Sequence, residues 1–402
     1  MDPKALLPSD RARNIKPSPT LAIDAKAKKM KAEGQDVVGF GAGEPDFDTP
    51  APIKEAAIQA IQAGFTKYTP SSGTEELRQA IAEKLKRDNG LDYPASQVVV
   101  SNGAKHSIAN AALALLNPGD EVIIPAPYWV SYPEIVKMAG GVPVILPTFE
   151  EDGFRVKPER LKRVLGGRTR LLILCSPSNP TGSVYPRGEL EALAEVLKPT
   201  DTLVLSDEIY EKLVYGGAAH VSFASVSQDA FGRTLTVNGM SKAYSMTGWR
   251  IGYCAGPEAL MKACANLQSH ATSNPASISQ KAALAALKGG GQEVEAMRQE
   301  FDRRRQAIVR LLNAVPGVSC QEPQGAFYAF PNISGLYGKS LGETKIGGST
   351  DFATALLEDS KVAVVPGADF GADDHIRLSY ATGMETIEKG VARIAEFAAK
   401  LK

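Results

Sequence analysis

One lysine in this sequence has neighbours that suit chemistry on a carbonyl group. Lys242 follows the segment LTVNGMS, so small or apolar residues surround it in the chain. A lysine that is removed from water has a lowered pKa, and its neutral amine can attack a carbonyl carbon. Arg250 lies further on, in TGWRIGY, and its guanidinium could bind a phosphate dianion. The simpler interpretation of both residues is an exposed surface cation, because most lysines and arginines are exposed.

Three polar residues after apolar runs could act on an aromatic cofactor. Asp207 follows the run TLVLS, and Tyr210 comes shortly after it. Asp207 could be the N-cap of a helix over EIYEKL, or its carboxylate could keep a pyridine nitrogen protonated. Asn179, in PSNPTG, could be an ordinary turn residue or could donate a hydrogen bond to a ring oxygen.

A short segment of small residues could bind an anion. Gly103, Ala104 and Lys105 open a predicted helix directly after a strand. Small residues allow backbone N–H groups at the positive end of a helix dipole to approach a phosphate. A simple strand-to-helix turn explains the same segment equally well.

Short apolar runs alternate with helical patterns over much of the chain. We predict strands at residues 97–103, 121–125, 171–175, 202–206, 235–237 and in a run that begins at residue 250. This alternation predicts an α/β fold with a mainly parallel sheet covered by helices on both faces. The turns SNGAK, PSNPTG, SDEIY and NGMSK each follow one of these strands. Because ligands bind beyond the carboxyl ends of such strands, the four turns predict a single site.

The C-terminal part has a different pattern, with a long charged helix near 291–313, short strands, a helix near 351–359 and a last helix from about 384. A chain of 402 residues exceeds the commonest domain size. We therefore predict a large domain over 46–290, and a smaller α+β domain formed by 1–45 and 291–402.

Composition excludes several classes of protein. Lysine plus arginine and aspartate plus glutamate both total 45, so the formal net charge is 0 and indicates neither nucleic acid nor a membrane surface as a partner. The N-terminus lacks the apolar core of a signal peptide, and no apolar stretch approaches the roughly 20 residues that span a bilayer. The four cysteines form no CxxC pair, which favours reduced thiols and a cytoplasmic protein with no metal site.

Taken together, the motifs resemble one family. They are GAGEPDFDTP, KYTPSSGTEELR, PYWVSYP, PSNPTG, SDEIYEKLVY, SKAYSMTGWRIGY, QGAFYAF and HIRLSYAT. This set is similar to the class I aminotransferases of PLP fold type I, from about residue 11 to the C-terminus. Within that family the sequence most resembles the bacterial subgroup Ib aspartate aminotransferases, some of which also transaminate prephenate.

The resemblance implies that pyridoxal 5′-phosphate (PLP) is the cofactor. Lys242 would bind it as a Schiff base and later move a proton. Asp207 would pair with the pyridinium nitrogen, and this charge makes the ring an electron sink. Asn179 and Tyr210 would bond the phenolic oxygen of the ring, and Trp129 would stack on it.

The resemblance also assigns a phosphate site. Its residues would be Gly103, Ala104, Lys105, Arg250 and, from the neighbouring subunit of a homodimer, Tyr68. Some relatives carry a phosphate-binding serine where this chain has Gly239, so that role would fall to Ser241 or be missing.

For the substrate, the resemblance implies that Arg377 binds the α-carboxylate beside Gly43, with Trp129 and Asn179 also in contact. A dicarboxylic substrate needs a second cation. Subgroup Ib relatives use a lysine at the position of Lys105, where other subgroups use an arginine from the partner chain. The corresponding stretch here, HATSNPASISQ, has no arginine. Lys16, in IKPSPT, is a further candidate, and relatives with a lysine there can accept prephenate.

We therefore expect transfer of an amino group between aspartate, or another acidic amino acid, and 2-oxoglutarate. Another PLP enzyme, such as a β-lyase or an aminotransferase for other amino acids, remains an alternative because this scaffold hosts several reactions. A PLP-binding transcription regulator is not expected, because the family pattern begins too early to leave room for a DNA-binding domain.

Overall fold

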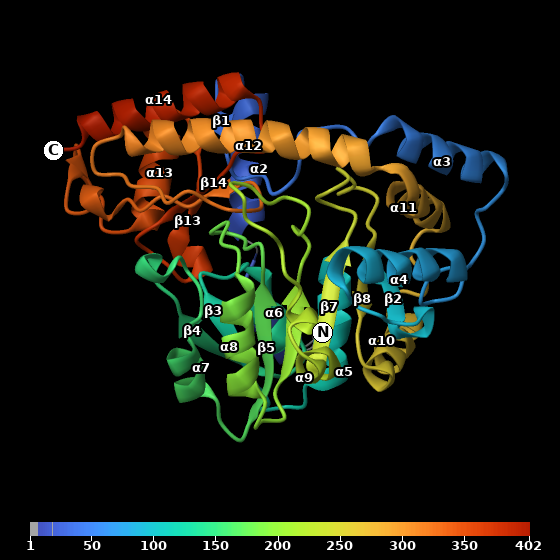
Figure 1. Cartoon of the computed structure of the whole chain (residues 1–402). Helices are drawn as coiled ribbons and strands as arrows, with labels where there is room; N and C mark the ends of the chain where they lie inside the picture. The colour runs from blue at the N-terminus through green and yellow to red at the C-terminus, as the bar shows by residue number, and fades with distance from the viewer. Residues whose placement is uncertain (1–6, 18) are drawn as a thin grey trace.

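The structure of the chain is a computed structural model that describes residues 7–17 and 19–402. A seven-stranded sheet in the order β2-β8-β7-β6-β5-β3-β4 forms the centre of its larger part (Figure 1). Its strands are β2 (Val98–Ser101), β3 (Glu121–Ala126), β4 (Val142–Pro147), β5 (Thr169–Cys175), β6 (Leu203–Asp207), β7 (Thr234–Gly239) and β8 (Gly252–Ala255). Neighbouring strands are parallel except that β8 is antiparallel to both β2 and β7. The predicted α/β fold with a mainly parallel sheet is therefore confirmed.

Strand β4 is a correction, because the sequence analysis predicted no strand there. It lies at the edge of the sheet and carries prolines at both 143 and 147. A proline cannot donate to a neighbouring strand, so an edge strand with one side unpaired accommodates it readily. The strand segment VPVILP is apolar, yet Val142 and Ile145 are exposed, as its edge position allows.

Helices surround the sheets of the molecule. In the part of the chain that the structure describes they are α1 (Asp10–Arg13), α2 (Pro19–Ala32), α3 (Ala51–Gln62), α4 (Glu75–Asn89), α5 (Ala104–Leu115), α6 (Ser131–Met138), α7 (Pro158–Val164), α8 (Arg187–Leu197), α9 (Gln228–Arg233), α10 (Glu258–Ala271), α11 (Ser277–Gly289), α12 (Gly291–Asn313), α13 (Ser349–Ser360) and α14 (Met384–Lys400). None of these described helices is both long and apolar enough to cross a membrane.

Both faces of the central sheet are covered, as the alternation of side chains along a strand requires. In β3, Val122 and Ile124 pack with α5, α6 and α10. Ile123, between them, packs on the opposite face with α7 and α8. Helices α4 and α11 cover the region of β2 and β8 through a further core cluster.

The C-terminal part contains a three-stranded antiparallel sheet in the order β13-β14-β9, together with α12, α13 and α14. The remaining strands are short: β1 (Val38–Gly39), β9 (Tyr328–Ala329), β10 (Ser340–Leu341), β11 (Thr344–Lys345), β12 (Val362–Ala363), β13 (Val365–Pro366) and β14 (Ile376–Ser379). Figure 1 shows α12 and α14 running side by side above the central sheet.

The N-terminal segment joins this C-terminal part. Strand β1 pairs in parallel with β12, with Val38 opposite Val362. Helix α12 begins at Gly291, directly after α11. These contacts suit a small domain built from both ends of the chain, while its limits at residues 45 and 291 stay a prediction.

Candidate active site

A cavity of 430 Å³ lies beyond the carboxyl ends of the central strands. Cys175 ends β5 and Asp207 ends β6, and both side chains line this cavity. Helix α5 contributes its first residues, and the N-terminal and C-terminal parts of the chain close the space from the other side. The predicted residues that line it are Lys242, Asp207, Tyr210, Asn179, Trp129, Ala104, Lys105, Ser241, Arg250, Gly43 and Arg377.

Lys242 lies in the cavity with its amine largely removed from water. Its Nζ donates a hydrogen bond to the Gly43 carbonyl oxygen at 2.5 Å. Aromatic rings flank it, with Nζ 6.0 Å from the ring centre of Tyr210 and 5.9 Å from that of Phe327. Burial disfavours the charged amine and lowers the pKa of Lys242 to about 8. A neutral, nucleophilic lysine is therefore accessible close to neutral pH.

Asp207 is buried at the end of β6, where its carboxylate is held by two donors. Its Oδ2 accepts from the Tyr132 hydroxyl at 2.7 Å, and its Oδ1 accepts from the Ile209 backbone N–H at 3.3 Å. Burial raises the pKa of Asp207 to about 6, although the hydrogen bond from Tyr132 opposes this shift. The helix predicted over EIYEKL is wrong, because these residues form successive turns. Asp207 therefore caps a turn rather than a helix, and one carboxylate oxygen faces Tyr132.

Arg377 is a buried cation without a carboxylate partner in the described part of the chain. Its Nη1 donates to Asn179 Oδ1 at 3.0 Å and its Nη2 donates to the Gly41 carbonyl oxygen at 2.8 Å. Its Nε is buried and has no hydrogen-bond partner among the described residues. The guanidinium also lies 4.5 Å from the ring centre of Tyr328. A buried, incompletely satisfied guanidinium that faces a cavity suits a carboxylate ligand.

Tyr210 and Tyr328 form the wall between Lys242 and Arg377. Their hydroxyl oxygens are 2.8 Å apart, so one donates to the other. Tyr328 belongs to β9 of the C-terminal sheet, whereas Tyr210 follows β6 of the central sheet. The hydroxyl pair therefore links the two sheets inside the site.

The opposite end of the cavity has the form of an anion cradle. Gly103 has φ +84°, and a Cβ atom there would lie 2.3 Å from Arg250 Nη2. At Gly252 a Cβ atom would lie 2.1 Å from the Ala104 backbone nitrogen. Arg250 donates to the carbonyl oxygens of Thr247 at 2.8 Å and Asn102 at 3.4 Å. Only glycines permit this close approach of backbone, guanidinium and the start of α5.

Position 239 has no room for a side chain. A Cβ atom at Gly239 would lie 2.9 Å from both the Gly252 Cα and the Ile251 carbonyl oxygen. Ser241 is buried and lines the cavity. If a hydroxyl acts at this end of the site, Ser241 is the residue placed to supply it.

The side chain of Lys105 lies against Trp129 at the wall of the cavity rather than only in solvent. Its Nζ lies 4.8 Å from the ring centre of Trp129. Burial, and then the charge of Arg250, lower the pKa of Lys105. Trp129 packs edge-on against Tyr132, with ring centres 5.3 Å apart.

Three predicted residues do not line the cavity. Gly103 lies just behind its wall, as described above. Lys16 is exposed, and its backbone N–H donates to Glu134 Oε2 at 3.1 Å. Tyr68 is 91% exposed and contributes nothing to the cavity of its own chain.

The sequence analysis did not single out several residues that line the cavity, among them Tyr132 and Tyr328, which bond predicted site residues. Tyr132 lies in the first turn of α6, and its backbone N–H donates to the Trp129 carbonyl oxygen at 3.0 Å. Its place three positions after Trp129, in the motif PYWVSYP, is a signal that could have found it. Tyr328 lies within the quoted motif QGAFYAF, but the alternation of that short strand does not reveal which side chains face the site.

Comparisons with known proteins agree with this geometry. The family model for aminotransferases of class I and II matches residues 35–394. The aspartate aminotransferase of Geobacillus stearothermophilus is 52% identical over 387 residues, which is 96% of this chain and 98% of the relative. The aspartate/prephenate aminotransferase of Cereibacter sphaeroides is 51% identical over 98% of this chain and 99% of the relative.

Solved structures give the same result. The aspartate aminotransferase from Rhizobium meliloti has a TM-score of 0.96 at 46% identity, covering 99% of this chain and 100% of that one. The Thermus thermophilus aspartate aminotransferase with maleate has a TM-score of 0.91 at 45% identity, covering 97% of this chain and 99% of that one. This chain belongs to the family of class I and II aminotransferases.

Proposed function

We propose that the protein is a PLP-dependent aspartate aminotransferase, which transfers an amino group between aspartate and 2-oxoglutarate and forms oxaloacetate and glutamate. One observation carries the proposal: a single cavity holds both the buried amine of Lys242 and the buried guanidinium of Arg377, which has no carboxylate partner among the described residues. An amine can react with a carbonyl, and the guanidinium can bind the carboxylate of an amino acid. Two relatives that are 52% and 50% identical to this chain are named aspartate aminotransferase.

The residues of the cavity fit PLP. When bound, PLP supplies a carbonyl for the amine and a ring that withdraws electrons. The cradle formed by Gly103, Ala104 and Arg250, together with Ser241, would hold the phosphate. Asp207 would face the ring nitrogen as a carboxylate.

Other side chains would orient the ring. Asn179 and Tyr210 lie on the side of the cavity near Arg377 and would bond the ring oxygen. Trp129 would stack on the ring face. Lys242 is the residue that would take a proton from the substrate carbon and return it to the cofactor, because its amine is neutral in a large fraction of molecules near pH 8.

For the substrate, we assign the α-carboxylate to Arg377, beside Gly43. The side chain of Tyr328 limits the space there, since a Cβ atom at Gly43 would lie 3.1 Å from its hydroxyl. The distal carboxylate is assigned to Lys105, whose amine lies over Trp129. Lys16 stays a candidate for larger dicarboxylates, although its side chain lies outside the cavity of the isolated chain.

Prephenate is a second candidate substrate, in addition to aspartate. Its support is that relatives from Cereibacter sphaeroides and Nitrosomonas europaea, 51% and 48% identical, are named aspartate/prephenate aminotransferases.

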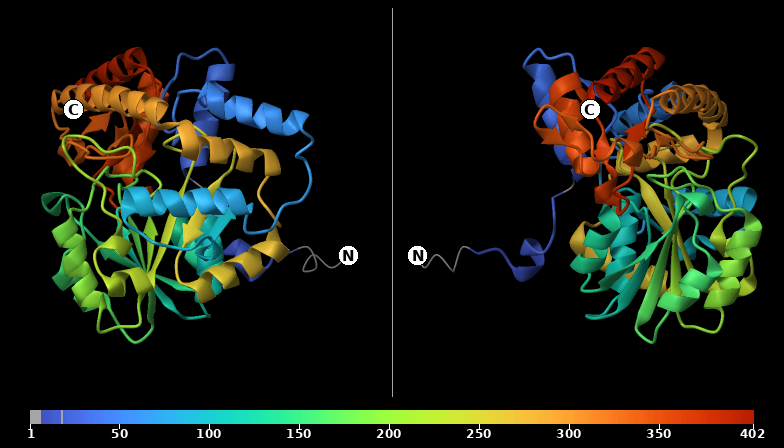
Figure 2. Two further views of the ribbon diagram at one scale, coloured as in Figure 1. Left: turned by 45° about the vertical axis from the view of Figure 1, so that its right-hand side comes forward. Right: turned by 90° about the vertical axis from the view of Figure 1, so that its left-hand side faces the viewer.

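We further propose a homodimer with shared active sites. Tyr68 is 91% exposed, although tyrosines usually bury their rings. The segment that carries α1 extends away from the rest of the chain, as Figure 2 shows, and its residues 7–14 are all exposed. A second copy would provide partners for both. The four free cysteines suit a reducing compartment, and we place the protein in the cytoplasm.

A substrate screen tests the function. Purified protein loaded with PLP is given aspartate, glutamate, alanine or phenylalanine with 2-oxoglutarate or oxaloacetate, and the products are identified. We expect aspartate and 2-oxoglutarate to give the highest kcat/KM, with no turnover in Lys242→Ala. A clear preference for neutral amino acids, or release of ammonia instead of glutamate, would reject the assignment.

A further inference from the structure

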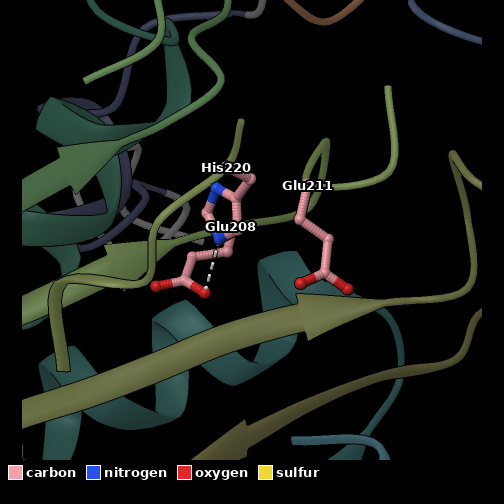
Figure 3. A group of neighbouring side chains, drawn as sticks. All are labelled: Glu208, Glu211 and His220. Carbon is pink, nitrogen blue, oxygen red and sulfur yellow. Dashed lines mark hydrogen bonds and ion pairs between the residues drawn. The ribbon is translucent and has the colours of Figure 1, made fainter. Parts of the chain in front are cut away.

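A buried group of charged side chains lies directly behind the turn that carries Asp207 and Tyr210. Asp207 and Tyr210 line the cavity, whereas Glu208 and Glu211 do not. Figure 3 shows Glu208 and Glu211 with His220, and the ligand atoms of these three residues lie within 4.8 Å of one another. The turn therefore has a front that faces the cavity and a back that faces a buried polar cluster.

On the back of the turn, Glu208 is fully engaged by neighbouring donors. Its Oε1 accepts from Ser206 Oγ at 2.8 Å and from Ser222 Oγ at 2.7 Å. Its Oε2 lies 3.1 Å from His220 Nε2. Glu208 is only 1% exposed, so these contacts replace water around the carboxylate.

Glu211 is held by the end of helix α4. Lys84 forms an ion pair with its Oε1, and Asn89 Nδ2 donates to its Oε2 at 2.8 Å. Lys84 Nζ also donates to Asn89 Oδ1 at 2.7 Å, which closes a ring of contacts among the three side chains. Lys84 is 3% exposed, which is rare for a lysine and requires a charged partner.

This cluster does not need a metal ion. Both oxygens of Glu208 and both oxygens of Glu211 already have protein partners. The ammonium of Lys84 supplies the positive charge that a cation would otherwise bring.

With Glu208, Glu211 and Lys84 charged, a protonated His220 brings the charges of the cluster into balance. Glu208 and Glu211 contribute two negative charges, and Lys84 contributes one positive charge. Asp88 lies 3.9 Å from Lys84, but Lys212 at 2.7 Å and Arg87 at 2.8 Å also pair with it. Burial by itself lowers the pKa of His220, but the charge and hydrogen bond of Glu208, followed by the charge of Glu211, outweigh burial and raise it. An unbalanced charge here would be costly, because the surroundings are buried.

The cluster is mechanically coupled to the site through the short turn. The Glu211 backbone N–H donates to the Glu208 carbonyl oxygen at 3.0 Å, and the Leu213 N–H donates to the Tyr210 carbonyl oxygen at 2.8 Å. Asp207 directly precedes Glu208 and Tyr210 directly precedes Glu211, so we expect a shift of either glutamate to displace its neighbour in the site.

We propose that Lys84, Glu208, Glu211 and His220, here called the back network, are positioning residues that hold Asp207 and Tyr210 in register with the cofactor, and that protonated His220 completes the network. The inference rests on the proposed function, since it assumes that these two residues contact PLP. It predicts that PLP is held less tightly when the back network loses a charge, although none of its members touches the cavity.

Equilibrium binding of PLP to the full-length apoprotein tests the proposal, with thermal unfolding measured in parallel. The variants are His220→Gln, which removes the charge but can keep a donor to Glu208, and Lys84→Met. Their controls are Glu83→Gln and Lys86→Met, which each remove the charge of an exposed residue on helix α4. We expect PLP affinity to fall by roughly tenfold in both test variants and to be unchanged in the controls. A tenfold loss is the lower end of the range for removing residues that orient a metal ligand, which we take as a guide.

The pH profile separates positioning from general stability. Because the pKa of His220 is raised, its charge is present at low pH and is lost as the pH rises through that pKa. The ratio of wild-type to His220→Gln affinity should therefore decrease toward one as the pH rises. Wild-type PLP affinity in both variants, or a ratio that does not change with pH, would overturn the proposal even if the melting temperature fell.

Misfolding of Lys84→Met calls for a further variant, and failure of the wild-type protein to bind PLP calls for a different conclusion. If Lys84→Met does not fold, the double variant Lys84→Met/Glu211→Met leaves no unpaired charge, and it should fold but bind PLP more weakly than wild type. Wild-type affinity in the double variant would contradict the proposal. If the wild-type protein itself fails to attach PLP at Lys242, the proposed function fails instead of the back network.

Discussion

Lys242 and Asp207 have opposite charges, and burial shifts their pKa values toward each other. The pKa of Lys242 falls to about 8 and that of Asp207 rises to about 6. Both shifts have the same cause, because a low-dielectric site disfavours any charged form. The consequence is chemical: the lysine can lose its proton, and the carboxyl group can hold one, within a narrow range around neutral pH.

The pH dependence of PLP attachment follows from the shift at Lys242. Only the neutral amine reacts with a carbonyl, so attachment should accelerate as the pH rises through about 8 and then level off. A lysine with its ordinary pKa of about 10.4 would show no plateau below pH 10. Stopped-flow absorbance of apoprotein mixed with PLP measures this rate. Borohydride reduction and peptide mapping should place the adduct on Lys242, and a rate still rising at pH 10 would contradict the shift.

Lys105 should decide between acidic and neutral substrates. Its amine lies over Trp129 inside the cavity, where a distal carboxylate could reach it. Loss of a charge-assisted hydrogen bond costs about 1.5–3 kcal/mol, so Lys105→Ala should lower kcat/KM for aspartate by roughly 10–100-fold. Alanine and phenylalanine should be affected far less. Lys198→Ala, an exposed lysine on α8's C-terminal side, is the control. An equal loss for all three substrates would assign Lys105 to the phosphate alone.

The sequence analysis identified the residues that lie in recognisable motifs better than the residues that hold those side chains in place. Lys242, Asp207 and Asn179 line one cavity, as the turns after the strands predicted, and Arg377, which the family resemblance implied, lines it too. Tyr132 supports Asp207 from a helix far away in the sequence. The spacing from Trp129 indicates that Tyr132 lies near the site, but its contact with Asp207 depends on how α6 packs against α5, β3 and β4.

At the scale of elements, the mostly buried strands of the central sheet were predicted and its edge strand β4 was missed. The segment VPVILP is apolar, but prolines at 143 and 147 weaken its resemblance to a strand. The antiparallel direction of β8 was also beyond prediction, since strand direction depends on connections rather than composition. The segment EIYEKL has helical residues but forms turns, because Glu208, Tyr210 and Glu211 are fixed by tertiary contacts.

The turn into α5 gives a test at this scale. Gly103→Ala places a methyl group against Arg250 at a φ of +84°, so it strains the backbone and displaces the guanidinium from the anion cradle. We expect a stability loss of about 1–3 kcal/mol and weaker PLP binding. Gly90→Ala is a matched control, because φ there is +71° but no atom lies within 4 Å of the added carbon.

Equilibrium unfolding and PLP titration of both variants check this expectation. Gly90→Ala should lose stability and keep its affinity for PLP. If Gly103→Ala also keeps its affinity, the turn contributes only to folding, and the anion cradle has to be formed by other residues.

In the whole molecule, the site lies where distant parts of the chain meet. Gly43 comes from the N-terminal segment, Asp207 from the end of β6, Lys242 from the turn after β7, and Arg377 from β14. One core cluster continues from Tyr210 to Phe301 of α12 and Phe397 of α14. Binding of the substrate carboxylate therefore depends on how the C-terminal part is held against the central sheet.

The remaining prediction concerns a second copy of the chain. Tyr68 is exposed and does not line the active-site cavity of its own chain, so its proposed role requires the site of a partner subunit. We expect Tyr68→Ala and Lys242→Ala each to be strongly impaired as pure dimers. In a mixed dimer, the Tyr68→Ala subunit keeps Lys242 and receives Tyr68 from its partner, so one of the two sites is intact. Random exchange makes half of the dimers mixed, and activity should recover to about a quarter of the wild-type value. Mixing two preparations of Tyr68→Ala is the control and should recover nothing. Exchange is verified by native mass spectrometry with differently tagged chains, and proven exchange without recovery would show that Tyr68 does not act across the interface.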